Sequence, residues 1–309
     1  MIRIKTYIVP IILVCLCGCF LTGCFSLEVQ PNEEEAVVKV TPKSEEKKEE
    51  TEVQEKTEVP EEAEMTFTRD GKTIYGKLYT PKGDGPHPAV ILGHQFGANH
   101  STMEGYAKAF AENGIMAYAF DFIGGGHDIK SDGVMEEMSV LTEAADMSTV
   151  LDGIRALDDV DKDNVFLMGA SQGGFVATYV AGIRPDDVKG LIAFYPAYVL
   201  QDDARKRTNN GADMKDTFTA LGATLSRIYD EDALSFDIYD VMKKYDGKAL
   251  ILHGTADTLV PVEYSQRAAN TMPDATLVIV EGAGHGFGGT DDKNATDAAI
   301  YFVKENVSK

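Results

Sequence analysis

Cysteine is scarce in this sequence of 309 residues, and no cysteine follows position 24. The four that exist are Cys15, Cys17, Cys19 and Cys24. The remaining chain therefore offers neither a disulfide nor a thiolate metal site, and its stability must come from a buried core.

Basic residues are also in the minority. The chain has 29 Lys and Arg against 50 Asp and Glu, a net charge of −21. A surface this acidic repels nucleic acid, so we expect no nucleic-acid partner. No internal repeat at the periods of solenoid proteins is visible either.

The first 24 residues have the pattern of a secretory signal. Arg3 and Lys5 precede the apolar run "YIVPIILVCLCGCFL", which is short for a membrane-spanning helix. The segment then ends in "LTGC", which resembles a bacterial lipobox. That resemblance implies lipidation of Cys24 and an extracytoplasmic protein anchored to the bacterial cell membrane. A plain transmembrane anchor is the alternative.

Residues 25–64 differ in composition from the residues after position 64. They contain fourteen Glu and five Lys, with prolines at positions 31, 42 and 60. Such a segment buries too little apolar area to offset the entropy of ordering, so we predict a disordered acidic tether.

Residues 65–309 are predicted to form one α/β domain. Short apolar runs such as "PAVILGH" and "KALILHG" alternate with segments of helical periodicity, and Asp70-Gly71 marks an opening hairpin. This alternation predicts a mostly parallel sheet with helices on both faces, whose chemistry lies at the carboxyl ends of the strands.

The interval 197–245 breaks that alternation and is predicted to be a small inserted lid. Its aromatic residues include Tyr198, Phe218, Tyr229, Phe236 and Tyr239, which either line an acyl pocket or pack within the lid.

A G-x-S-x-G pattern stands between a predicted strand and a predicted helix, in "FLMGASQGGFVATYV". Gly169 and Gly173 permit a turn too tight for larger residues, and this turn would expose the hydroxyl of Ser171. A serine that merely caps a helix is the simpler alternative.

Two further residues follow other strand ends and supply what a serine nucleophile needs. His285 lies in "EGAGHGFGG" after the last predicted strand, where its imidazole can act as a base. Asp257 lies four residues beyond the strand that ends at His253. In this position its carboxylate can orient the imidazole of His285. We therefore predict that Ser171, Asp257 and His285 form a catalytic triad.

An oxyanion formed at such a serine requires two backbone N–H donors. We predict that Gln172 provides one, because it directly follows the serine. Phe96, in the loop "GHQFGANHS", is predicted to provide the other. His94 is interpreted as a brace for this loop and not as a base.

Five motifs together carry a family resemblance: "HQFGANHS", "FDFIGGGHDIKSDG", "GASQGG", "ILHGTADTLVP" and "GAGHGF". In this order they resemble the α/β-hydrolase superfamily over residues 65–309, and most of all its bacterial cinnamoyl/feruloyl esterase branch. The resemblance implies an α/β-hydrolase fold and hydrolysis of a small-molecule ester, with no cofactor and no metal. Gln95 departs from the glycine usual in the family, which bears on the second oxyanion donor.

Two other functions remain open from the sequence. A serine peptidase of the same fold would need carboxylates to bind a peptide amine, and the predicted lid offers Asp202, Asp203, Asp213 and Glu231. A catalytically inactive binding lipoprotein is the second alternative. The identity of the acyl and alcohol groups and the oligomeric state are not predicted.

Overall fold

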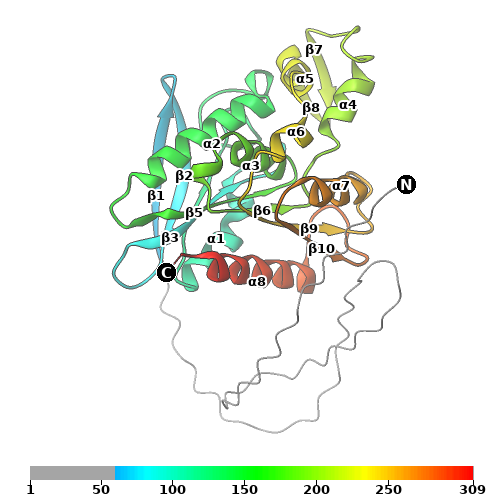
Figure 1. Cartoon of the computed structure of the whole chain (residues 1–309). Coiled ribbons are helices and arrows are strands. Elements are labelled where there is room, and N and C mark those ends of the chain that lie inside the picture. Colours follow the sequence, from blue (N-terminus) through cyan, green and yellow to red (C-terminus); the bar gives the residue numbers. More distant parts are fainter. Residues whose placement is uncertain (1–59, 309) are drawn as a thin grey trace, which may run out of the picture. The chain divides into compact units, whose positions relative to one another are not determined.

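The computed structural model describes residues 60–308 (Figure 1). The predicted signal segment 1–24 with its lipidation residue Cys24, and residues 25–59 of the predicted tether, lie outside the described residues.

A central sheet of eight strands organises these residues, in the order β1-β2-β4-β3-β5-β6-β9-β10. Only β2 runs against its neighbours, and all pairings from β4 to β10 are parallel. The predicted mostly parallel sheet is thus confirmed. The strand bounds are β1 Glu61–Arg69, β2 Lys72–Thr80, β3 His87–Gly93, β4 Met116–Phe120, β5 Val160–Ala170, β6 Gly190–Phe194, β9 Lys248–Gly254 and β10 Ala275–Val280.

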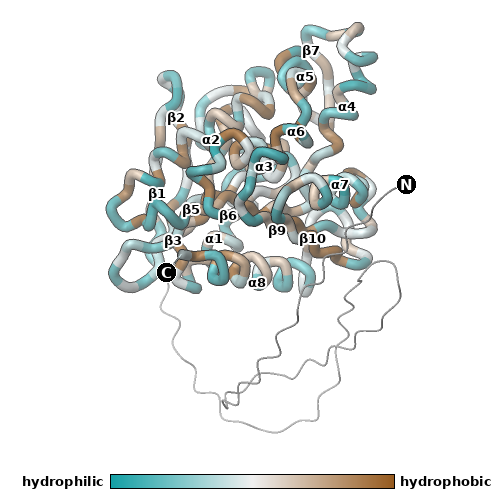
Figure 2. Tube along the Cα trace, viewed as in Figure 1, coloured by the Kyte–Doolittle hydropathy of each residue, from teal (hydrophilic) through white to brown (hydrophobic). Residues whose placement is uncertain are grey.

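Helices cover both faces of the sheet, as predicted. α2 (Val140–Arg155) and α3 (Gln172–Ile183) pack on one face, and α1 (Glu104–Glu112) and α8 (Gly289–Asn306) on the other (Figure 1). Side chains of β3 alternate between the two layers, since strands direct successive residues to opposite faces. Figure 2 shows the resulting concentration of hydrophobic residues along β5 and β6 in the interior.

Residues 197–245, which we call the insert, fold into short helices and one hairpin. This hairpin forms a two-stranded sheet separate from the central one. The elements are α4 Leu200–Arg207, β7 Thr217–Ala220, β8 Ala223–Ser226, α5 Arg227–Leu234 and α6 Ile238–Met242, followed outside the insert by α7 Glu263–Thr271. Short 3₁₀ turns also occur at His100–Met103, Met135–Glu137 and Pro185–Asp187.

The N-terminal strand begins earlier than the expected boundary at residue 65. β1 starts at Glu61, and its first residues pair with the end of β2, so residues 61–64 belong to the sheet and not to the tether. Glu64 accepts hydrogen bonds from the hydroxyl of Tyr75 (2.5 Å) and from Lys130 Nζ (2.9 Å). These partners, distant in sequence, hold a segment whose glutamate-rich composition is typical of disorder.

The opening hairpin has the predicted turn. Asp70 and Gly71 connect β1 to β2 with φ angles of 51° and 78°, which are the left-handed values that a two-residue hairpin turn requires. Among residues 60–308, none of the helices combines the length and apolar character that crossing a membrane would require.

The contact between β1 and α2 gives a test of packing. A Cβ at Gly153 would lie 2.1 Å from the ring of Phe67. We expect Gly153→Ala to lower the free energy of unfolding by about 1–3 kcal/mol in urea denaturation, because this overlap outweighs the gain in helix propensity.

Gly105→Ala is the matched control. Gly105 lies in α1, and a Cβ added there would have no atom within 4 Å, so this change should raise stability by about 0.5 kcal/mol. Equal effects of the two substitutions would contradict the packing of Phe67 on α2.

Candidate active site

The turn between β5 and α3 places Ser171 in a strained backbone conformation. Its φ is 51° and its ψ is −116°, outside the ordinary region for a residue with a side chain. A Cβ at Gly169 would lie 2.1 Å from the carbonyl oxygen of Gly173, and one at Gly173 would lie 2.3 Å from that of Gly93. Only glycine fits at these two positions.

The three residues of the predicted triad lie together at the carboxyl ends of three strands. The distance from His285 Nε2 to Ser171 Oγ is 2.9 Å, and from His285 Nδ1 to Asp257 Oδ2 it is 2.7 Å. Ser171 and Asp257 are buried, while the imidazole of His285 is partly exposed. The imidazole therefore bridges hydroxyl and carboxylate, as a general base needs.

Asp257 is held by more donors than His285 alone. Its Oδ1 accepts from the amides of Leu259 (2.9 Å) and Val260 (2.8 Å). Its Oδ2 also lies 3.1 Å from Nε2 of His253. The orientation of the carboxylate is therefore fixed by donors other than His285 as well.

His253 is a site residue that the sequence analysis missed. Its Nε2 faces two acceptors, Asp257 Oδ2 and the carbonyl of Val260 (2.9 Å), so Nε2 carries the proton. Its Nδ1 then accepts from the hydroxyl of Ser265 at 2.7 Å. The spacing of four residues from His253 to Asp257 was the available signal.

The two predicted oxyanion residues both border the pocket that contains Ser171. Gln172 is the first residue of α3, so its amide has no partner within the helix. The amide of Phe96 donates to no protein acceptor among residues 60–308. Both N–H groups are thus available to a ligand beside Ser171.

The loop that carries Phe96 is held in place by hydrogen bonds of the buried His94 side chain. His94 is buried, its Nε2 accepts from the amide of Phe122 (3.2 Å), and its Nδ1 donates to the carbonyl of Gln95 (2.8 Å). Burial lowers the pKa of His94, which keeps the ring neutral. The side chain of Gln95 is held at both ends: its Oε1 accepts from Thr102 Oγ1 at 2.9 Å, and its Nε2 donates to the hydroxyl of Tyr195 at 3.4 Å.

A cavity of about 200 Å³ opens beside Ser171, between the sheet and the insert. Its walls are mainly apolar, with Asp203 and Arg207 as the charged members. Of the aromatic residues of the insert, only Tyr229 lines it. The full lining is Phe96, Ser171, Gln172, Ala197, Val199, Leu200, Asp203, Arg207, Ala220, Leu221, Tyr229, Leu259 and Val260.

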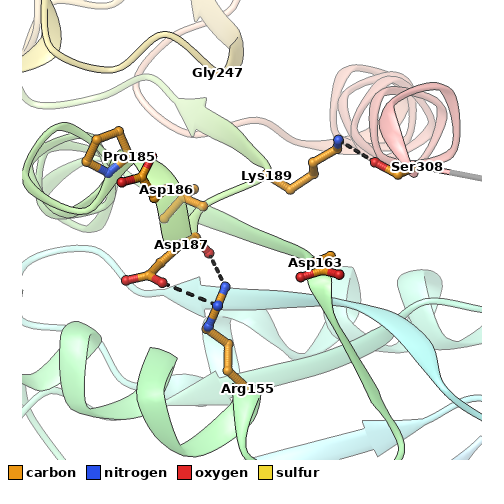
Figure 3. A pocket seen from close by; sticks show the side chains of 9 residues that line it. Arg155, Asp163, Pro185, Asp186, Asp187, Lys189, Gly247 and Ser308 are labelled. Carbon is orange, nitrogen blue, oxygen red and sulfur yellow. Dashed lines mark hydrogen bonds and ion pairs between the residues drawn. The ribbon is translucent and has the colours of Figure 1, made fainter.

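A larger hollow of about 420 Å³ lies elsewhere and is not the site (Figure 3). Lys189 and Gly247, which line it, directly precede β6 and β9, so it lies at the amino ends of the strands, opposite Ser171. The two basic side chains that line this hollow already have partners: Arg155 forms an ion pair with Asp187 at 3.3 Å, and Lys189 donates a hydrogen bond to Ser308 at 2.6 Å. In the part of the chain that is described, no group of three His, Cys, Asp or Glu side chains is placed to hold a metal ion.

Comparisons with known proteins agree with the α/β-hydrolase fold. The family model described as serine aminopeptidase, S33, matches residues 84–230, and that of TAP-like proteins matches residues 237–306. The chain is 23% identical over 215 residues to monoglyceride lipase of Rattus norvegicus, covering 67% of each protein. It is 26% identical over 264 residues to a non-heme chloroperoxidase of Kitasatospora aureofaciens, covering 71% of this chain and 90% of the relative.

Among solved structures, the chain is similar to Est1E from Butyrivibrio proteoclasticus with bound ferulic acid. The TM-score is 0.73 and the identity 26%, covering 79% of this chain and 100% of that one.

The hydrogen bonds of His253 predict its protonation state. Burial lowers its pKa, so at about pH 6.5 we expect a larger fraction of neutral ring, with the proton on Nε2, in the folded protein than in the unfolded protein. Histidine-selective ¹⁵N NMR would measure this, with the urea-unfolded protein as control, in which a histidine titrates at about pH 6.5. A doubly protonated His253 ring in the folded protein at that pH would be the contrary result.

Proposed function

This chain is a hydrolase of the α/β fold, and from that premise we propose that it cleaves carboxylic esters through an acyl-enzyme on Ser171. The observation that carries the proposal is the position of His285, hydrogen-bonded at once to Ser171 Oγ and Asp257 Oδ2. The adjoining cavity offers room for an acyl group and two free backbone donors.

The reaction follows from these positions. Ser171 Oγ attacks the ester carbonyl while its proton passes to Nε2 of His285, and Asp257 stabilises the imidazolium. The tetrahedral oxyanion accepts hydrogen bonds from the amides of Phe96 and Gln172, each worth about 3 kcal/mol in comparable sites. Collapse returns the proton to the alcohol, which leaves. A water molecule then attacks the acyl-enzyme in the same way, with His285 again accepting and returning the proton, and the acid is released from Ser171.

The dimensions of the cavity favour a small acyl group. Its volume and mainly apolar walls suit a short aliphatic or an aromatic acid, with Asp203 and Arg207 available to a polar substituent. Est1E, the structural relative, is described with ferulic acid bound. We therefore propose feruloyl, cinnamoyl or other small acyl esters as the substrate class.

Replacement of the nucleophile tests the mechanism. Ser171→Ala should lower kcat/KM toward aryl esters at least about ten-thousandfold and abolish labelling by a fluorophosphonate, since no other group can form the acyl-enzyme. Ser148→Ala, on the outer part of α2, is the control and should retain both. Persistent labelling of the Ser171→Ala protein would refute the assignment, and a wild-type protein that resists labelling would favour an inactive binding protein.

Peptide hydrolysis is the second candidate, favoured by the description of the matching family model. Of the four carboxylates considered for binding an amine, only Asp203 lines the cavity, and burial raises its pKa. Glu231 instead pairs with Arg227 on the surface.

A panel of acyl esters and aminoacyl amides distinguishes the two activities. We expect kcat/KM for small acyl esters to exceed that for aminoacyl amides by at least about a hundredfold, because one partly buried carboxylate is a weak site for a cationic amine. The reverse preference would establish the peptidase.

We further propose that the protein is extracytoplasmic and anchored to the bacterial membrane through lipidated Cys24, a proposal that rests on the "LTGC" motif. Cys24→Ala should move the protein from the membrane fraction to the soluble fraction and prevent incorporation of radiolabelled palmitate. An unchanged membrane fraction would favour a transmembrane anchor.

A further inference from the structure

A chain of three buried polar side chains links the insert to the oxyanion site. The hydroxyl of Tyr229, on α5, donates to Gln172 Oε1 at 2.7 Å, and Gln172 Nε2 donates to Glu143 Oε2 at 2.8 Å. All three residues are at most 6% exposed. Both ends of the Gln172 side chain are therefore fixed, one by the insert and one by α2.

Burial favours the protonated forms of the two ionisable residues in this network, Glu143 and Tyr229. Burial raises the pKa of Glu143 well above its usual range, and the nearby Asp146 acts in the same direction. Burial also raises the pKa of Tyr229, so its hydroxyl remains a donor. A buried, hydrogen-bonded network of this kind fixes the geometry of its members.

Tyr229 also contacts the second donor residue. Its ring meets that of Phe96 edge to face, with centroids 6.0 Å apart and planes at 73°. A single side chain of the insert thus touches both residues whose amides are proposed to bind the oxyanion.

The helix that carries Tyr229 is held by one contact within the insert and by another to α2 in the body of the domain. Asp230, the next residue, is buried and forms an ion pair with Arg207 of α4. Asp232 accepts a hydrogen bond from Ser139, the N-cap of α2. These contacts give Tyr229 a fixed position from which to restrain its neighbours.

We propose that Tyr229 is a positioning residue that couples docking of the insert to alignment of the two oxyanion donors. This inference rests on the proposed function, because it concerns the same oxyanion site. The insert then does more than form a wall of the acyl pocket: its presence completes the geometry that stabilises the transition state.

Tyr229→Phe removes only the hydroxyl and tests the coupling. For a short acyl ester we expect kcat to fall about tenfold with KM nearly unchanged, because the ground-state pocket keeps its shape. The inhibition constant of a boronic acid, whose oxygen occupies the oxyanion position, should rise by a similar factor. Ester binding measured on the Ser171→Ala background should not change.

Tyr239→Phe is the matched control. Tyr239 is another tyrosine of the insert with the same 6% exposure, and its hydroxyl donates to the carbonyl of Tyr264 (3.2 Å), away from the oxyanion residues. We expect kcat and boronic acid affinity within twofold of wild type. Thermal unfolding of both variants shows whether any loss reflects stability alone.

A double-mutant cycle with Gln172→Met gives the second test. Met removes the side-chain partners of Tyr229 and Glu143 while keeping the backbone amide, so Tyr229→Phe should cause no further loss of kcat in this background. Additive losses would overturn the inference, as would an effect of Tyr229→Phe on KM alone or equal losses in Tyr229→Phe and Tyr239→Phe.

These outcomes are separate from failure of the proposed function. A wild-type protein that neither hydrolyses esters nor reacts with a fluorophosphonate refutes the esterase proposal, and the coupling falls with it. An active wild type with an unaffected Tyr229→Phe variant refutes the coupling alone.

Discussion

The close approach of two backbone segments is the constraint on which the site depends. The first turn of α3 lies against the end of β3 so tightly that a Cβ at Gly173 would stand 2.3 Å from the carbonyl oxygen of Gly93. This contact brings Ser171, at the end of β5, next to the loop that carries Phe96. Without it, the hydroxyl and the second amide donor would not border the same cavity.

Around this contact, buried polar groups hold one another in place. Asp257 receives four hydrogen bonds, from two amides and two histidines, which compensates for the loss of hydration on burial. Across residues 60–308, the hydroxyl of Tyr79 is the one fully buried side-chain polar atom that lacks a partner. The buried polar side chains of the site thus have hydrogen-bond partners within the protein, and these hydrogen bonds hold the site in one geometry before a ligand binds.

The sequence predicts the parts of this site that follow from the parallel sheet. Ser171, Asp257 and His285 each follow a strand, and parallel strands end at one edge, so their convergence is readable from position alone. The role of His253 was hidden because a histidine ending a buried strand is more often structural.

Contacts made by docking of the insert could not be read in this way. Tyr229 and Gln172 are 57 residues apart, and no periodicity relates them. The start of β1 at Glu61 was missed for a related reason: its glutamates are stabilised by Tyr75, Lys108 and Lys130, which only the folded sheet brings near.

The place where the insert joins the chain has an evolutionary consequence. It leaves after β6 and returns before β9, two neighbouring parallel strands, so its length and sequence can drift without altering the register of the sheet. The segment is in this sense an exchangeable module, through which a lineage could reshape the cavity beside Ser171 while leaving Ser171, Asp257 and His285 in place. In the role we propose for it, Tyr229 sets the limit of that freedom, since any replacement module would have to present an equivalent hydroxyl to Gln172 or evolve another support for it.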